Sequence, residues 1–235
     1  MKTILFDLDG TLLPIDQELF IKAYFKRLAA RLATHGYDPE KLVSAIWEGT
    51  ADMIRNDGSI LNEAAFWNSF CRKFCDHVLA DKPIFDDFYH NEFQQVSESC
   101  GFVPEAAEVI ALCKQLGLRI ILATNPIFPA VATFSRIRWA GLNKDDFELI
   151  TTYENSSYCK PNPAYYQEII RKQQLDPAKC LMVGNDVGED MVAGKLGMKV
   201  FLLTDCLINK KNEAINQYPH GSFAELKAYI KEFAQ

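Results

Sequence analysis

The chain has 235 residues, of which 49% are hydrophobic, 12% aromatic and 24% charged, with 12 Gly and 10 Pro. This ordinary globular composition excludes disordered, collagen-like and low-complexity proteins. The 31 acidic residues outnumber the 25 Lys and Arg, so the net charge is −6. We therefore expect no nucleic-acid and no anionic-membrane partner, because both need clustered positive charge. The basic pair Lys210-Lys211 is interpreted as an exposed loop.

No targeting or membrane segment is apparent. The apolar run after Lys2 is interrupted at Asp7, well short of the ~7–15 apolar residues of a signal peptide. Seven Cys without short paired spacing favour reduced thiols over a disulfide framework, so we expect a cytoplasmic protein. Cys71, Cys75 and His77 could suggest a metal site, but the helical spacing of the two cysteines favours core packing.

The first hundred residues predict one strand and then only helices. Residues 2–7 form a β-branched and aromatic run that ends in Asp-Leu-Asp-Gly, which indicates a buried strand stopped by a turn. Helices are predicted to begin at Asp16, Asp38, Asn62 and Pro83, the last ending before Cys100-Gly101. Residues 15–100 therefore form a predicted four-helix bundle.

After Pro104 the predicted helices and strands alternate. Helices are expected at about 104–116, 128–140, 162–174, 187–196 and 222–234, and strands at 118–123, 147–151, 180–183 and 198–203. Such alternation predicts a parallel sheet covered on both faces. The fold class is thus α/β: a doubly wound, Rossmann-like core of residues 1–14 and 101–235, with an inserted α-helical bundle of residues 15–100.

Reactive side chains follow four of the predicted strands. They are Asp7 and Asp9, then Thr124 and Asn125, then Lys160, and finally Asp186 and Asp190. Because parallel strands end at one crevice, we expect these side chains to meet there. Two carboxylates ~4 Å apart repel by about 4 kcal/mol at an effective dielectric near 20, so cations are required. Lys160 supplies one charge, and the oxygen donors favour Mg²⁺ over Zn²⁺ as the other. A turn at Gly10 can aim backbone N–H groups at an anion, which suggests phosphate.

These segments resemble a known family. The runs Asp7-Leu8-Asp9-Gly10-Thr11, Ala123-Thr124-Asn125, Lys160-Pro161 and Gly184-Asn185-Asp186, with Asp190, are similar to the four ordered motifs of haloacid dehalogenase-like phosphohydrolases. The helical residues 15–100 resemble the inserted cap of that superfamily's first subgroup. The resemblance implies Mg²⁺-dependent hydrolysis of a small phosphorylated metabolite. Dehalogenases lack the second Asp, so Asp9 favours phosphate chemistry. Pro14 and Ile15 depart from the subgroup's usual Leu-x-Asp-Ser, which weakens any transfer of substrate preference.

The resemblance also implies a role for each residue. Asp7 would be the nucleophile that forms an aspartyl-phosphate, Asp9 the general acid and base, and Lys160 the group that neutralises the charge between nucleophile and phosphoryl group. The phosphate-binding set would be Thr124, Asn125, Leu8 and Lys160. Mg²⁺ would be held by Asp7, Asp9 through its backbone carbonyl, Asp186 and Asp190, the last directly or through water.

Several alternatives remain open at this stage. Asp186 could be a helix N-cap with Glu189, and Arg55 could meet an anionic substrate or lie in solvent. The aromatic residues of the bundle are expected to form its core rather than a ligand cage: Phe20, Tyr24, Trp47, Phe66, Trp67 and Phe70. The alternative functions are a phosphosugar mutase, a receiver-like signalling protein that accepts phosphate, and a catalytically silent binding protein. The sequence does not indicate the oligomeric state.

Overall fold

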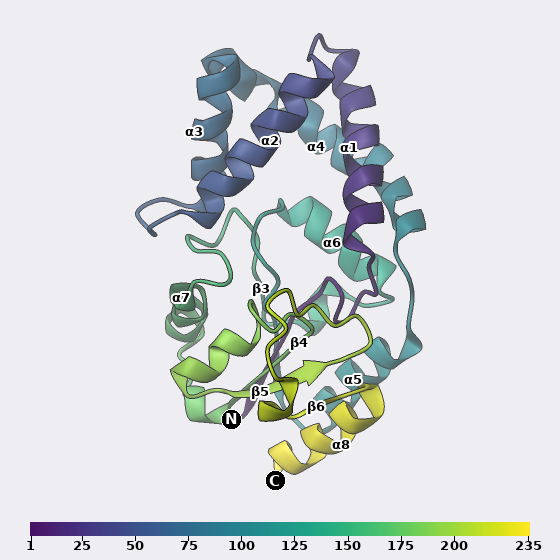
Figure 1. Cartoon of the computed structure of the whole chain (residues 1–235), viewed down its shortest axis with the longest axis vertical. Coiled ribbons are helices and arrows are strands. Elements are labelled where there is room, and N and C mark those ends of the chain that lie inside the picture. The colour runs from purple at the N-terminus through teal and green to yellow at the C-terminus, as the bar shows by residue number, and fades with distance from the viewer.

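The computed structural model describes the backbone of residues 1–235 and every side chain except those of Asp76 and His77. The His77 side chain considered above as a metal ligand therefore lies outside the described residues. Figure 1 shows two parts, a sheet with its covering helices and, beyond the carboxyl ends of the strands, a set of helices that we call the helical block.

Six strands form one sheet in the order β3-β2-β1-β4-β5-β6, and every neighbouring pair is parallel. The strands are β1 (Thr3–Phe6), β2 (Arg119–Leu122), β3 (Leu149–Ile150), β4 (Cys180–Gly184), β5 (Lys199–Leu203) and β6 (His220–Gly221). The predicted parallel sheet is confirmed. The edge strand β6 was missed because two residues are too short to carry a hydrophobic pattern.

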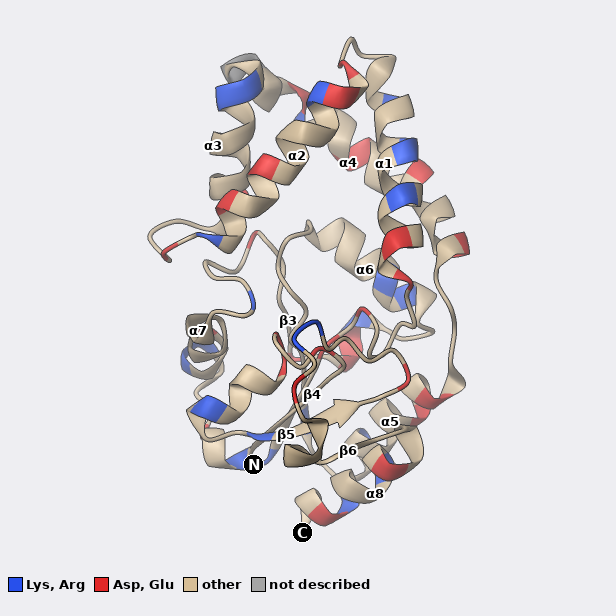
Figure 2. Cartoon of the chain, in the orientation of Figure 1, with Lys and Arg blue, Asp and Glu red and all other residues tan. Residues whose placement is uncertain are grey.

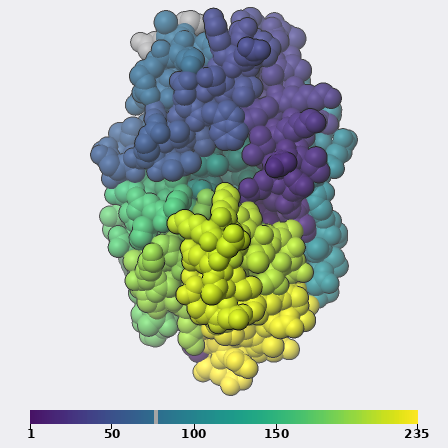
Figure 3. Space-filling view, in the orientation of Figure 1, coloured from purple at the N-terminus to yellow at the C-terminus, as the bar shows by residue number. Residues whose placement is uncertain are grey.

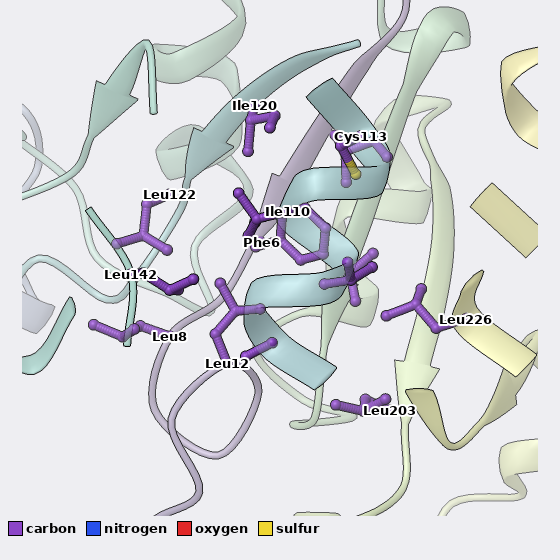
Figure 4. Close-up of a cluster of buried hydrophobic side chains, with 14 of the residues drawn as sticks. Phe6, Leu8, Leu12, Ile110, Cys113, Ile120, Leu122, Leu142, Leu203 and Leu226 are labelled. Carbon is purple, nitrogen blue, oxygen red and sulfur yellow. The ribbon is translucent and has the colours of Figure 1, made fainter. Parts of the chain in front are cut away.

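Burial on both faces explains the apolar run of β1. Ile4 and Phe6 belong to the core that packs under α5 (Pro104–Gln115) and α8 (Phe223–Ala234), whereas Leu5 packs on the opposite face. Successive strand residues point to opposite faces, so both must be apolar in a sheet that is covered twice. Figure 4 shows the first of these clusters, in which Phe6 lies close to Ile110 of α5 and Leu8 lies beside Leu142.

Helices cover the second face of the sheet and the carboxyl ends of its strands. Leu5 packs with residues of α7 (Pro163–Gln173) and of the short 3₁₀ helix η5 (Met191–Leu196). The helix α6 (Ala130–Trp139) lies between the sheet and the helical block, since its residues pack in the cores of both. Three further 3₁₀ turns are η3 (Lys144–Asp146), η4 (Pro177–Lys179) and η6 (Ile215–Gln217).

The helical block begins with the helices that the sequence predicts. It contains α1 (Gln17–Ala33), α2 (Pro39–Ile54), α3 (Asn62–Phe74), η1 (Asp76–Asp81), α4 (Lys82–His90) and η2 (Glu92–Ser99). The Asp16 carboxylate accepts hydrogen bonds from two N–H groups of the first turn of α1, and that of Asp38 accepts one from the Lys41 N–H. In Figure 2 both signs of charge are distributed over the block and the sheet part.

The fourth predicted helix is wrong in its second half. The chain leaves the helix at Asn91 and continues as the 3₁₀ segment η2. The Asn91 side-chain amide donates to the Asp87 carbonyl and carboxylate, and such side-chain bonds to nearby acceptors compete with helix continuation.

The predicted helix at 187–196 is likewise only the 3₁₀ segment η5. The Asp186 carboxylate accepts the N–H groups of Gly188 and Glu189, while the Asp190 carboxylate accepts that of Asp186. These bonds form a compact loop in place of the first helical turn.

Two connections join the helical block to the sheet part. They lie side by side, since the Gly101 N–H donates to the Pro14 carbonyl at 2.8 Å. The domain boundaries expected here, 1–14 and 101–235 against 15–100, remain a prediction.

The helical block also contacts the sheet part at the start of α3. There the N–H of the buried Asn62 donates to the Ser156 carbonyl, and its side-chain amide donates to the Pro126 carbonyl. Figure 3 shows the two parts as one continuous body, with the loop after β5 reaching their junction. Among the described residues, no helix has both the length and the apolar character needed to cross a bilayer.

Candidate functional site

Polar residues from distant parts of the chain line one small cavity at the carboxyl ends of β1, β2 and β4. The cavity measures about 150 Å³, and its lining includes Asp7, Asp9, Thr124, Asn125, Asp186 and Asp190. The structure thus brings six of the predicted site residues together. Of the other two, Lys160 contacts Asp7 and Asp190. Leu8 has its side chain fully buried in the core, so only its backbone can face a phosphate.

Lys160 is a buried cation between two carboxylates. Its Nζ donates to Asp7 Oδ1 at 2.8 Å and to Asp190 Oδ1 at 2.6 Å, and its side chain is only 1% exposed. Burial alone would lower the pKa of Lys160, but the carboxylates of Asp190 and Asp7 raise it well above its ordinary value. The lysine therefore stays protonated, and the cationic partner expected for the converging acids is present.

Asp190 uses both carboxylate oxygens within the protein. Oδ1 accepts from Lys160 and Oδ2 accepts from the Asp186 N–H at 2.9 Å. Burial raises the pKa of the Asp190 carboxyl, and the Lys160 ammonium acts in the opposite direction. Since both carboxylate oxygens of Asp190 accept hydrogen bonds within the protein, the geometry favours a role for Asp190 in orienting Lys160 and the Asp186 loop.

The last residue of β4 must be glycine for this arrangement to form. A Cβ at Gly184 would lie 2.1 Å from Asp190 Oδ2. Gly184→Ala is therefore expected to displace Asp190, to lower the free energy of unfolding by about 1–3 kcal/mol, and to lower activity. Chemical denaturation measures the first effect and phosphate release the second. Gly194→Ala is the matched control, because its Cβ would meet nothing closer than 3.6 Å. Equal effects of the two substitutions would contradict the steric argument.

Asp9 has a partner that the sequence analysis missed. Its Oδ2 accepts a hydrogen bond from Arg136 of α6, whose side chain is only 1% exposed and whose guanidinium lies 4.5 Å from the centre of the Phe128 ring. Asp9 Oδ1 is buried with no hydrogen-bond partner among the described residues. Burial raises the pKa of Asp9, and Arg136 opposes that shift. One feature of the sequence could have indicated that Arg136 is buried. It lies three residues after Thr133 and four before Ala140, and therefore on the buried face of α6.

The two predicted phosphate-binding residues after β2 are held by the helix α7 and by neighbouring loops. The Thr124 carbonyl accepts hydrogen bonds from the hydroxyls of Thr151 and Tyr165. The Asn125 side chain accepts the Lys160 N–H and donates to the Glu189 carboxylate. Asn125 therefore fixes the position of the Lys160 loop.

The turn after β1 is fixed by Asn185, which the sequence analysis quoted only as part of a motif. Thr11 Oγ1 lies 3.0 Å from Asn185 Oδ1 and 3.3 Å from Asp7 Oδ2. Gly10 has φ +84°, and a Cβ there would lie 2.3 Å from Asn185 Nδ2. Glycine is required at position 10 for both its dihedral angle and its space.

The carboxylates do not form a closed metal cage. Among the described residues, no group of three or more His, Cys, Asp or Glu side chains is close enough to hold an ion. Asp7 and Asp186 nevertheless line the same cavity, and within the described part of the chain Asp7 Oδ2 accepts only the 3.3 Å bond from the Thr11 hydroxyl. Mg²⁺ is commonly bound by one or two carboxylates with several waters, so this donor set fits it. The N-cap-like bonds of Asp186 to Gly188 and Glu189 use Oδ1.

A second, larger cavity of about 400 Å³ extends from Asp9 into the helical block. The expectation that the bundle aromatics form its core is confirmed for Phe20, Tyr24, Trp67 and Phe70, which are buried in it, and Phe66 packs against them. Trp47 differs, because it is 49% exposed. Five of the six also line this cavity: Phe20, Tyr24, Trp47, Phe66 and Trp67. Arg55 lies in solvent, paired with Asp52.

The fold and the site define a class of protein: a doubly wound α/β protein whose acids, lysine and threonine converge at the ends of its strands. The model of the haloacid dehalogenase-like hydrolase family matches residues 1–197. The chain belongs to this family, which confirms the resemblance and the prediction of a hydrolase.

Curated relatives and solved structures agree with this assignment. The chain is 26% identical to the phosphoglycolate phosphatase of Vibrio vulnificus (strain YJ016), over 87% of this chain and 84% of that one. It is 31% identical to hexitol phosphatase B of Escherichia coli (strain K12), over 44% and 43% of the two chains. A HAD phosphatase from Thermococcus onnurineus has a similar fold, with a TM-score of 0.60, 19% identity and 98% coverage of both chains.

Proposed function

We propose that the chain is a Mg²⁺-dependent phosphatase that hydrolyses a small phosphorylated metabolite through an aspartyl-phosphate on Asp7. One observation carries the proposal: the Asp7 carboxylate lies 2.8 Å from the buried Lys160 Nζ, in a cavity also lined by Thr124 and Asp186. A nucleophile, a fixed cation, a hydroxyl donor and a second acid are the groups that phosphoryl transfer requires. The names of the relatives support the same class of reaction.

The reaction would run in two steps. A carboxylate oxygen of Asp7 attacks the phosphorus atom, the bond from phosphorus to the ester oxygen breaks, and Asp9 gives that oxygen a proton. Water then attacks the phosphorus of the aspartyl-phosphate, Asp9 takes a proton from this water, the bond from phosphorus to the Asp7 oxygen breaks, and inorganic phosphate and the free Asp7 carboxylate result. Asp9 Oδ1 suits the proton transfers, because Arg136 holds Oδ2 and Oδ1 has no partner among the described residues.

The phosphate would be bound by charge and by hydrogen-bond donors. Lys160 would offset the charge shared by Asp7 and the phosphoryl group, and the Thr124 hydroxyl would donate to a phosphoryl oxygen. The Leu8 N–H and the Asn125 amide would complete the set. We also propose that residues 15–100 act as a cap on the core of residues 1–14 and 101–235, excluding water from the site.

Mg²⁺ would be held by the carboxylates of Asp7 and Asp186 and by the Asp9 carbonyl, with Asp190 acting through Lys160, the Asp186 loop or water. When bound, the ion would offset the negative charge of the phosphoryl oxygens. EDTA is expected to abolish hydrolysis and added Mg²⁺ to restore it. Asp186→Asn is expected to raise the Mg²⁺ concentration for half-maximal rate at least ~10-fold, since one charged donor is lost. If neither EDTA nor the Asp186→Asn substitution changes the rate, Mg²⁺ is not bound at this site.

The proposal is tested by phosphate release in the presence of Mg²⁺ from a panel of sugar phosphates, phosphoglycolate and nucleotides. Turnover that yields inorganic phosphate is the expected result. An isomerised sugar phosphate without phosphate release would indicate a mutase. A phosphorylated protein that accumulates without turnover would indicate a receiver-like phosphoacceptor.

A further inference from the structure

The larger cavity begins where a leaving group would be. It shares Asp9, Asn125 and Phe128 with the smaller cavity, and it extends from there between the helices of the helical block. A phosphoryl group placed beside Asp7 would therefore direct the alcohol part of its ester into the larger cavity. The inference below rests on the proposed phosphatase function and concerns the chemistry of that alcohol.

Aromatic rings dominate the wall of this cavity. Phe20, Tyr24, Trp47, Phe66, Trp67 and Phe128 contribute, from α1, α2, α3 and the loop before α6. Trp47 is 49% exposed, and the neighbouring lining residues Ile21 and Ile54 are 36% and 44% exposed. Large apolar side chains thus stay in contact with solvent along the cavity, where a ligand can cover them.

Positive charge is scarce around the cavity. Its lining from the described part of the helical block contains one charged residue, Asp86, which is acidic. Arg55, the cation at the end of α2, pairs with Asp52 and does not line the cavity. Among the described lining residues, the one lysine or arginine is Lys210, in the exposed loop after β5, where it offsets the nearby Glu189. The Lys82 ammonium lies 4.9 Å from the centre of the Trp67 ring, but it pairs with Glu63, and Arg136, over the Phe128 ring, pairs with Asp9. A second phosphate or a carboxylate on the substrate would therefore meet no unpaired cation among the described lining residues of the helical block.

We propose that the substrate is a phosphate monoester whose alcohol carries a planar aromatic ring system and no second anionic group. Rings can stack on the aromatic wall, which adds stabilisation beyond burial of their area. A polyol or a carboxylate would lose hydration against these rings, and the polar lining from the described part of the helical block, chiefly Gln17, Thr50, Asp86 and the unpartnered Trp67 Nε1, replaces only part of it. By this chemistry the substrate differs from those in the names of two relatives, phosphoglycolate and hexitol phosphates.

Naphthalen-2-ylmethyl phosphate, sorbitol 6-phosphate and phosphoglycolate test the proposal, because all three are esters of a CH₂–O group. We expect kcat/KM for the naphthyl ester to exceed both others at least tenfold. Equal or better turnover of either polar ester would overturn the proposal. Acetyl phosphate, whose leaving group is too small to fill the cavity, tests the phosphatase chemistry alone.

Binding gives a readout that does not depend on turnover. The Asp7→Asn protein, titrated with each ester in a calorimeter, should bind the naphthyl ester at least tenfold more tightly than the polar esters. If neither acetyl phosphate nor any of the three esters is hydrolysed but this preference holds, the substrate class stands and the proposed function fails. If acetyl phosphate is hydrolysed and the preference is absent, the substrate class fails.

Variants of exposed lining residues locate the binding site. Trp47→Ala should lower kcat/KM for the naphthyl ester about fivefold to tenfold, the loss expected for one ring contact. Phe102→Ala is the matched control, since Phe102 is 61% exposed and lies outside the cavity. Ile54→Arg should raise kcat/KM for phosphoglycolate and lower it for the naphthyl ester, whereas Ile60→Arg, at an exposed position outside the lining, should change neither. Equal responses within either pair would overturn the assignment of the cavity.

Discussion

Replacing Asp7 by Asn is expected to lower kcat for phosphate release by about four orders of magnitude, with the fold intact. The amide has the shape of the carboxylate but cannot attack phosphorus. Lys160 keeps one carboxylate partner in this variant, because Asp190 Oδ1 lies 2.6 Å from its Nζ. Phosphate release measures the loss, circular dichroism reports the fold, and mass spectrometry of acid-quenched protein should detect no phosphorylated enzyme.

The control for this substitution is Asp145→Asn, the same chemical change at an exposed position in η3, which should leave the rate unchanged. A rate for Asp7→Asn within tenfold of the unchanged protein would exclude Asp7 as the nucleophile. A phosphorylated peptide that lacks residue 7 would exclude it as well.

The sequence alone was sufficient to predict the sheet and the meeting of its acidic residues. Short apolar runs separated by helical patterns require a parallel sheet, and parallel strands end at one edge. Asp7 and Asp186 had to lie near each other once β1 and β4 were neighbours. The two strands are neighbours in the sheet, with Phe6 paired with Val183. The position of Lys160 among the carboxylates followed less directly, from the need to offset converging charge, and its burial was not predicted.

Features that depend on side-chain packing were not predictable in the same way. An apolar stripe on α1 or α2 indicates a buried face, but it does not say whether a helix or a cavity lies opposite. Trp47, which is half-exposed, therefore appeared to be core. The contact of Arg136 with Asp9 joins residues 127 positions apart in the sequence, and it depends on how α6 is placed above the strand ends. The break at Asn91 arises from one side chain that bonds to Asp87. Periodicity cannot report such local competition.

Removing the buried cation is expected to have the largest effect on stability. Lys160→Met would leave the carboxylates of Asp7 and Asp190 near each other without the ammonium between them. Breaking a buried ion pair in this way costs about 3–5 kcal/mol of the free energy of unfolding. Activity should fall about 10³-fold, since the charge that offsets the phosphoryl group is also lost. Chemical denaturation and phosphate release measure the two effects on the same protein.

A second substitution separates stability from catalysis. Adding Asp190→Asn to Lys160→Met removes one of the two unpaired charges and keeps an oxygen that can accept the Asp186 N–H. The double variant should regain part of the lost stability and none of the lost activity, because only the charge repulsion is relieved. Lys114→Met, which breaks an exposed pair with Asp146, should cost less than about 1 kcal/mol and leave the rate unchanged. If Lys160→Met costs no more stability than Lys114→Met, the buried carboxylates are not held together by Lys160. If the double variant regains activity along with stability, Lys160 acts through folding and has no part in phosphoryl transfer.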